Sequence, residues 1–183
     1  MLSEHAEPIQ KEKGCIHLYH GDGKGKTTAA MGLAIRAAGA GKSVLIYQFL
    51  KNNDSSERKI LSMTPNITCI KGPEKMKFTS RMTEKEKQEQ LKQNDIILSE
   101  ILKQSEDYDM LILDEALYAI DLNQLTEGPL LRYLEKRPQS QEVILTGRNP
   151  SQEMIEIADY CSHIQKQKHP FDVGVKSRIG IEH

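Results

Sequence analysis

A turn rich in glycine and lysine joins an apolar run to a helix-forming run near the start of the sequence. The letters are CIHLYHGDGKGKTTAA at residues 15–30. Backbone N–H groups of such a turn, at the N-terminus of a helix, point towards a bound anion, and the helix dipole adds about half a positive charge there. Gly21, Gly23 and Gly25 would let the chain approach phosphate oxygens without a Cβ in the way. The stretch therefore predicts a phosphate-binding loop.

Two residues of this turn have side chains suited to a nucleotide. Lys26 is placed to reach the terminal phosphates, and the Thr27 hydroxyl to ligate Mg²⁺, as in the pattern Gly-x-x-x-x-Gly-Lys-Ser/Thr. His20 stands where that pattern has its first glycine, so the match is imperfect. A charged turn without a ligand is the alternative that the loop alone leaves open. The expected ATP contacts of the loop are Gly21, Asp22, Gly23, Lys24, Gly25, Lys26, Thr27 and Thr28.

A second apolar run ends in two carboxylates. Met110–Asp114, followed by Glu115, has the form of a strand whose carboxyl end lies beside a phosphate loop, where a carboxylate can hold Mg²⁺ directly or through water. Because successive side chains of a strand point to opposite sides, Asp114 and Glu115 should not share one role. The sequence leaves open which of them ligates Mg²⁺ together with Thr27. An ordinary strand end with an acidic cap is the competing interpretation.

The residues expected to act in catalysis are Lys26, Thr27 and Glu115. Two arginines are further candidates for phosphate contacts. Arg148 follows an apolar run, and Arg36 follows Lys26 by ten residues, which is nearly three helical turns. A surface ion pair is an equally good interpretation of each arginine.

Short apolar runs alternate with helix-forming runs, and these elements must position the site. The first helix is expected at about 27–38, stopped by Gly39 and Gly41, and a second at 83–104, signalled by the capping-box pattern Thr83-x-x-Glu86. A third should start at Asn149-Pro150 and continue through Ala158. The alternation predicts βαβ units, hence an α/β fold with a mainly parallel sheet covered by helices on both faces. The expected strands are Cys15–His20, Ser43–Leu50, Ile67–Ile70, Met110–Asp114 and Val143–Thr146.

Composition limits the class of protein. The 183 residues are 38% hydrophobic and 28% charged, as expected of one globular domain, and no apolar run approaches the ~18 residues that span a bilayer. No secretory signal is visible, which predicts a cytoplasmic protein. The formal charge of −1 argues against nucleic-acid or membrane partners. Residues 1–14 are expected to form a polar arm and residues 15–183 the domain.

The cysteines and one histidine suggest structural roles. Cys15, Cys69 and Cys161 are widely spaced, without a Cys-x-x-Cys pair, which favours reduced core thiols over disulfides or a zinc site. His17 lies in an apolar run and is expected to be a hydrogen-bonded structural histidine.

The sequence resembles the ATP:corrinoid adenosyltransferases of the bacterial cobalamin pathway, in the type that has a phosphate loop. The C-terminal block is the most specific, because phosphate loops occur in many ATPases. Members of this family generally lack the first consensus glycine, so His20 agrees with the resemblance. The matching blocks are GDGKGKTTAA at 21–30, VLIYQFLK at 44–51, LDE at 113–115 with Tyr118, TGR at 146–148 and HPFDVGVKSRIGIEH at 169–183.

The resemblance implies a RecA-like, P-loop NTPase-like single domain, a homodimer, and a loop that grips the tripolyphosphate of ATP as it leaves. In the implied reaction, a Co(I) corrinoid such as cobalamin or cobyrinic acid diamide attacks the 5′ carbon of Mg-ATP. This reaction serves adenosylcobalamin biosynthesis or salvage. The nucleophile is the cobalt of the substrate, which accounts for the lack of a Ser/His/Asp or Cys/His constellation. A flavin-type reductant or flavoprotein is the implied electron source.

The chain departs from the family pattern at its aromatic positions. Family members place an aromatic pair in a Phe-Thr-Trp segment that displaces the lower axial ligand of the corrinoid. Here Phe78 is kept and is the expected corrinoid contact, but Ser80 stands in place of the tryptophan and His183 in place of the usual tyrosine. Two alternatives stay open: a RecA-like enzyme that hydrolyses ATP with Glu115 activating water, and a corrinoid carrier or regulator that has lost activation through the change to Ser80.

Overall fold

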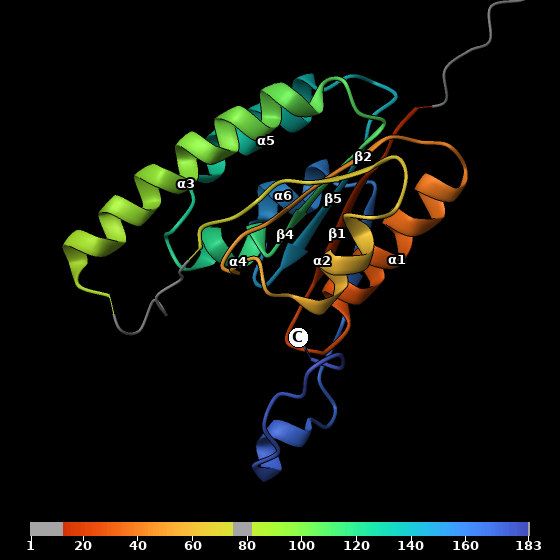
Figure 1. The fold of residues 1–183 in the computed structure, drawn as a ribbon. Coiled ribbons are helices and arrows are strands. Elements are labelled where there is room, and N and C mark those ends of the chain that lie inside the picture. Colours follow the sequence, from red (N-terminus) through yellow and green to blue (C-terminus); the bar gives the residue numbers. More distant parts are fainter. Residues whose placement is uncertain (1–12, 75–81, 183) are drawn as a thin grey trace, which may run out of the picture.

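The computed structural model describes residues 13–74 and 82–182 and contains a six-stranded sheet in the order β3-β2-β4-β5-β1-β6 (Figure 1). All strand pairings in it are parallel. The α/β fold with a parallel sheet is therefore confirmed. The strands are β1 (Ile16–His20), β2 (Val44–Gln48), β3 (Ile67–Cys69), β4 (Met110–Asp114), β5 (Glu142–Gly147) and β6 (Tyr160–His163).

Helices cover both faces of the sheet, with α1 and α2 on one side and α3 and α5 on the other (Figure 1). The central strands are apolar throughout because each must contact a helical layer on both faces. In β4, Leu111 and Leu113 pack into the α3–α5 layer, while Met110 and Ile112 pack into the α1 layer. The helices are α1 (Lys26–Gly39), α2 (Ser56–Leu61), α3 (Glu84–Ser105), α4 (Ala116–Asp121), α5 (Glu127–Lys136), α6 (Gln152–Ile157) and the 3₁₀ helix η2 (Pro170–Val173).

The two predicted helix starts have different outcomes. The capping box is confirmed, because the Thr83 side chain accepts from the Glu86 N–H and the Glu86 carboxylate accepts from the Thr83 N–H. The start of α6 at Asn149-Pro150 is wrong. Asn149 has a φ of 47°, and the cap is Ser151, whose hydroxyl accepts from the Met154 N–H. The Ser151 hydroxyl, two residues beyond Asn149, accepts from an otherwise unpaired N–H of the first helical turn, so α6 begins at Gln152.

The cysteines are free thiols, as expected of a reduced protein. Cys15 and Cys69 are half-buried, but Cys161 is exposed, so the expectation of core thiols is wrong for Cys161. Its strand, β6, lies at the edge of the sheet and has no buried residue. His17 is hydrogen-bonded to the Glu142 carboxylate on a neighbouring strand, which confirms its structural role.

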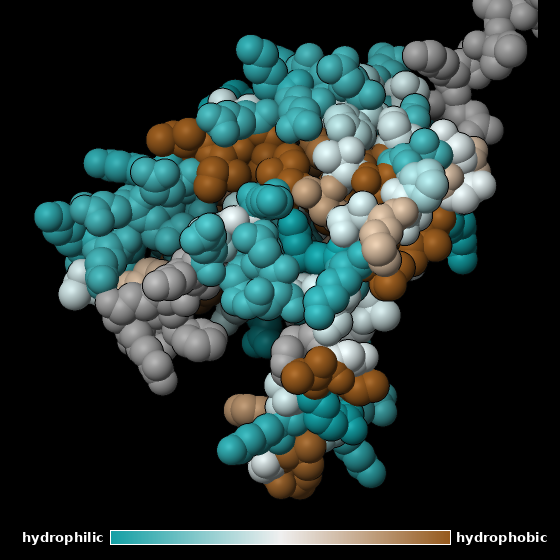
Figure 2. Space-filling model, in the orientation of Figure 1, coloured by the Kyte–Doolittle hydropathy of each residue, from teal (hydrophilic) through white to brown (hydrophobic). Residues whose placement is uncertain are grey.

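A C-terminal tail, residues 164–182, extends from the carboxyl end of the sheet and carries η2 at its far end (Figure 1). Figure 2 shows apolar side chains gathered on the surface of this projecting part. Phe171, Val173 and Ile179 are 73%, 81% and 82% exposed. The tail therefore adds little to the core, and its apolar side chains face solvent.

Parts of the sequence predictions lie outside the described residues. These parts are residues 1–12 of the expected polar arm, Phe78 with Ser80, and His183. Within residues 13–74 and 82–182, no helix is both long enough and apolar enough to cross a membrane.

Candidate active site

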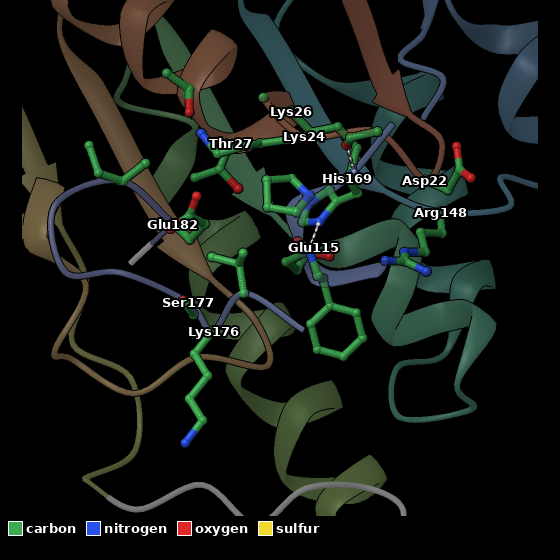
Figure 3. Close-up of a pocket in the computed structure, with 17 residues that line it drawn as sticks. Asp22, Lys24, Lys26, Thr27, Glu115, Arg148, His169, Lys176, Ser177 and Glu182 are labelled. Carbon is green, nitrogen blue, oxygen red and sulfur yellow. Dashed lines mark hydrogen bonds between the residues drawn. The ribbon is translucent and has the colours of Figure 1, made fainter. Parts of the chain in front are cut away.

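A pocket of about 360 Å³ lies between the loop after β1 and the C-terminal tail (Figure 3). Its size is typical of small-molecule sites, and it lies outside the carboxyl ends of parallel strands, where α/β proteins commonly bind ligands. It brings most of the predicted site residues together. Its lining comprises Asp22, Gly23, Lys24, Gly25, Lys26, Thr27, Thr28, Glu115, Arg148, His169, Pro170, Phe171, Val175, Lys176, Ser177, Ile181 and Glu182.

The loop presents the N-terminus of α1 to this pocket. Gly25 is the N-cap, with a φ of 116°, and no side chain among the described residues caps the helix. The amides of the first turn therefore need an acceptor from outside the protein, and a phosphate is such an acceptor. Lys26 donates to the Gly23 carbonyl oxygen at 2.8 Å, and burial lowers the pKa of its ammonium. A bound anion would offset the cost of burying that charge.

The three loop glycines have different reasons to be glycine. A Cβ on Gly21 or Gly23 would lie 2.5 or 2.7 Å from the carbonyl oxygen of Ile164, where the tail begins. The Gly23 N–H donates to that oxygen at 2.8 Å, and the Gly21 N–H donates to Gly147. Gly21 is also outside the pocket lining. The sequence predicted open space for a phosphate beside all three glycines. Of the three, only Gly25 has no atom within 4 Å of an added Cβ.

Asp114 is fully buried at the end of β4 and accepts four hydrogen bonds. Its Oδ1 accepts from the hydroxyls of Thr27 at 2.8 Å and Thr146 at 2.6 Å. Its Oδ2 accepts from Lys51 Nζ at 2.7 Å and Gln48 Nε2 at 3.1 Å. Burial alone would raise the pKa of Asp114, but the Lys51 ammonium and the hydrogen bonds hold it below its usual range. Asp114 is therefore an ionised carboxylate bound to the loop hydroxyl.

Glu115 faces the other way and lines the pocket (Figure 3). Its φ of 59° is left-handed, and its N–H donates to the Thr146 hydroxyl at 2.9 Å. Because β4 ends at Asp114, this left-handed turn, and not the alternation of side chains along a strand, separates its carboxylate from that of Asp114. Burial and then the Asp114 charge raise the pKa of Glu115, while Lys51 and Lys26 lower it in part.

The oxygen atoms at this corner suit a hard cation. The Thr27 hydroxyl and the carboxylates of Asp114 and Glu115 are the ligand types that Mg²⁺ takes. In the part of the chain that the structure describes, no group of three or more His, Cys, Asp or Glu side chains can hold a metal. A cation here would therefore have to complete its coordination with substrate phosphates and water, as Mg²⁺ does in nucleotide sites.

The two predicted arginines lie in different places. Arg148 lines the pocket, and its guanidinium carbon lies 5.1 Å from the centroid of the Tyr118 ring. Arg36 is exposed in the last turn of α1 and outside the lining. Ten residues of helix carry it about 15 Å along the axis from Lys26. The structure does not bring Arg36 to the pocket.

Sequence reasoning missed Lys51 and the tail as parts of this site. Lys51 follows the carboxyl end of the central strand β2, just as Arg148 follows that of β5. A polar residue at such a strand end is a candidate site residue, so the same criterion could have identified Lys51. The tail has no periodic pattern to indicate where it lies. It is held to the loop by Asp22, whose carboxylate accepts from the Lys166 N–H at 2.9 Å. That bond lowers the pKa of Asp22.

Sequence comparisons with known proteins match almost the whole chain. Residues 12–183 match the family described as ATP:corrinoid adenosyltransferase BtuR/CobO/CobP. The corrinoid adenosyltransferase of Escherichia coli (strain K12) is 35% identical over 182 residues, which cover 95% of this chain and 88% of that protein. Corrinoid adenosyltransferase CobA of Salmonella typhimurium (strain LT2) is 34% identical with the same coverage.

One solved structure supports the fold alone. The crystal structure of the KaiC-like protein PH0186 from the hyperthermophilic archaeon Pyrococcus horikoshii OT3 superposes with a TM-score of 0.51 at 19% identity. The match covers 86% of this chain and 75% of that one.

Proposed function

The chain belongs to the ATP:corrinoid adenosyltransferase family, and from this membership we propose that it transfers the 5′-deoxyadenosyl group of ATP to the Co(I) form of a corrinoid. The electron pair of Co(I) forms the bond to the 5′ carbon. The bond from that carbon to the triphosphate oxygen breaks, and its electron pair leaves with tripolyphosphate. The protein must neutralise the leaving group and hold carbon and cobalt in line.

The observation that carries this proposal is the uncapped start of α1, with Lys26 beside it in the pocket. The amides of the first turn and the Lys26 ammonium would bind the triphosphate and stabilise the charge that develops on it. Removing one such donor typically costs 10²- to 10³-fold in rate. Arg148 and Lys24, which also line the pocket, add positive charge at the same end.

Mg²⁺ fits the oxygens at the buried corner of the site. The residues that would hold it are Thr27 with Asp114, or with Glu115 as the alternative carboxylate, and the ion would neutralise charge on the leaving phosphates. The Thr27 hydroxyl donates its proton to Asp114, which leaves its lone pairs for a cation. Glu115 is more readily protonated than an ordinary glutamate, so its contribution depends on cationic neighbours.

The opposite wall of the pocket is suited to the nucleoside and the corrinoid. The tail contributes the apolar side chains of Phe171, Val175 and Ile181, all exposed to solvent. We infer that the adenosine lies against these side chains, with its 5′ carbon towards the open mouth. Phe78, outside the described residues, remains the proposed contact below the corrin ring.

The remaining features of the proposal follow from the family. We propose a homodimer in the cytoplasm that receives the electron for Co(II) reduction from a flavin-type reductant or flavoprotein. The reaction would serve adenosylcobalamin biosynthesis or salvage.

Product identity tests the proposal. Purified protein is mixed anaerobically, in the dark, with Mg-ATP and chemically reduced cob(I)alamin, and both products are assayed. We expect a light-sensitive adenosylated corrinoid and intact tripolyphosphate in equal amounts. Release of orthophosphate without adenosylation would identify an ATP-hydrolysing enzyme instead, and binding of both substrates without a product would identify a carrier or regulator.

The loop is tested by one substitution in the same assay. Lys26→Ala should lower the rate at least tenfold, because it removes a cation from the leaving group. Lys42→Ala removes an exposed lysine outside the pocket lining and should leave the rate unchanged. Equal rates in both variants would remove the loop from the mechanism.

A further inference from the structure

Lys51 places an ammonium group on the oxygens that are expected to bind the metal. Its Nζ lies 2.7 Å from Asp114 Oδ2 and 3.3 Å from Thr27 Oγ1. Glu57 lies farther away, at 4.0 Å. The Lys51 side chain is 26% exposed, whereas that of Asp114 is not exposed at all. A protein cation therefore occupies the corner formed by the loop threonine and the carboxylate at the end of β4.

A metal ion at this corner would compete with the ammonium for the same oxygens. The Thr27 hydroxyl donates its hydrogen to Asp114, so the Lys51 ammonium lies against the lone-pair side of the hydroxyl oxygen. A Mg²⁺ bound to the same oxygen would lie about 2 Å from it. The ion and the ammonium would then be close neighbours of like charge at a poorly solvated site, where repulsion is weakly screened.

We propose that Lys51 is the resident cation of the Thr27–Asp114 corner and that a divalent metal binds there only when the ammonium leaves. This inference rests on the proposed Mg-ATP site. Lys51 balances the charge of Asp114, so a free metal ion gains little by replacing it. A metal that arrives on a triphosphate brings negative charge with it, and the released ammonium can pair with a phosphate oxygen. Lys51 thus makes the site selective for the metal–nucleotide complex over the free metal.

Lys51 is able to make this move. It lies three residues beyond the end of β2, in a connection that precedes α2, whereas Thr27, Gln48, Asp114 and Thr146 belong to helices or strands. Its side chain is partly exposed, unlike that of Gln48, which is buried within β2. Gln48 continues to donate to Asp114 if Lys51 leaves, so the carboxylate keeps its orientation.

Binding of free Mn²⁺, followed by electron paramagnetic resonance without nucleotide, tests the proposal. Lys51→Met should bind Mn²⁺ at least tenfold more tightly than the unsubstituted protein. Lys42→Met carries the same change of charge at an exposed position outside the site and should match the unsubstituted protein. Adding Asp114→Asn to Lys51→Met should abolish the gain, which ties it to this corner.

Two further measurements keep the outcomes distinct. Circular dichroism checks that each variant folds. If Lys51→Met does not fold, Lys51→Gln replaces it, because glutamine keeps an N–H donor for Asp114 without the charge. Lys51→Gln should show the same gain in Mn²⁺ affinity. Failure of every folded Lys51 variant to gain Mn²⁺ affinity overturns the proposal. Binding of ATP is titrated separately by calorimetry. If ATP does not bind the unsubstituted protein, the proposed function fails, whatever the Mn²⁺ result.

Discussion

The two walls of the pocket are built in opposite ways. On the sheet side, Asp114 is fully buried and every oxygen of its carboxylate is hydrogen-bonded. On the other side, the tail is joined to the loop by few bonds, among them Gly23 to Ile164 and Lys166 to Asp22. One wall belongs to the core of the fold, whereas the other rests on its surface.

This difference separates two demands of the reaction. Stabilisation of a highly charged leaving group needs dipoles and charges that are fixed before the substrate arrives, and in the proposed mechanism the buried wall would supply them. Binding a nucleoside and a large corrinoid needs a wall that can adjust, and weakly held segments supply such motion. Substitutions in the buried wall should therefore affect both stability and function, and substitutions in the tail should affect function alone.

The largest expected effect is on stability, from Asp114→Ala. It leaves the Lys51 ammonium and three other donors without their acceptor in a buried site, so the free energy of unfolding should fall by about 3 kcal/mol. Asp172→Ala, which breaks an exposed ion pair with Lys166 in the tail, should change it by less than about 0.5 kcal/mol. Urea unfolding measures both, and similar losses would erase the contrast between the walls.

A smaller effect is expected where the walls meet. Gly23→Ala places a Cβ 2.7 Å from the Ile164 carbonyl oxygen, which should cost about 1–3 kcal/mol of unfolding free energy. It should also speed tryptic cleavage within the tail. Gly32→Ala on the exposed side of α1 meets no atom within 4 Å and should stabilise the protein by about 0.5–1 kcal/mol. Equal changes in both variants would show that the tail is not seated on the loop.

A still smaller effect is expected within the tail. Phe171 is 73% exposed, so Phe171→Ala should leave the unfolding free energy within about 0.5 kcal/mol. The same change should weaken ATP binding by about 1 kcal/mol, roughly fivefold, if the ring contacts adenosine. Val173→Ala is the matched control, because Val173 is exposed but does not line the pocket. Calorimetry showing the same affinity in all three proteins would place the nucleoside elsewhere.

The smallest expected effect is the pH dependence of the stability that Glu115 contributes. Folding raises the pKa of Glu115 above its ordinary value of 4.5. Between pH 4.5 and the folded-state pKa, the native state therefore binds more protons than the unfolded state. Its contribution to stability is present below pH 4.5 and is lost as the pH rises through the folded pKa. As the pH rises through the folded-state pKa, the unsubstituted protein should therefore lose stability relative to Glu115→Gln. Thermal unfolding of both proteins at a series of pH values measures this difference. A difference that grows in the opposite direction would contradict the burial of Glu115.

Much of the buried wall was predictable from the sequence because each part of it is local. The apolar run into GDGKGKTTAA predicts strand, turn and helix together, and the run at 110–114 predicts a central strand that ends in a carboxylate. The capping box at Thr83 needs only four residues to be recognised. The family resemblance then supplied the reaction, which the motifs alone do not specify.

The rest was not predictable because it depends on contacts between distant residues. Gly21 and Gly23 are required by Ile164, some 140 residues later, and the strand β6 that precedes it is short and exposed. Arg36 was expected near the phosphates from its helical spacing, but the spacing gives its side of the helix and not its distance from the pocket. Lys51 follows a strand end, and its role emerges only when β2 and β4 are paired.

The most direct test of the central claim is a crystal structure with Mg²⁺ and an ATP analogue that cannot transfer its adenosyl group. The triphosphate should lie on the amides of Gly25, Lys26 and Thr27, with the 5′ carbon facing the side lined by the tail. An analogue bound away from this turn, or one with its 5′ carbon directed into the sheet, would contradict the assignment.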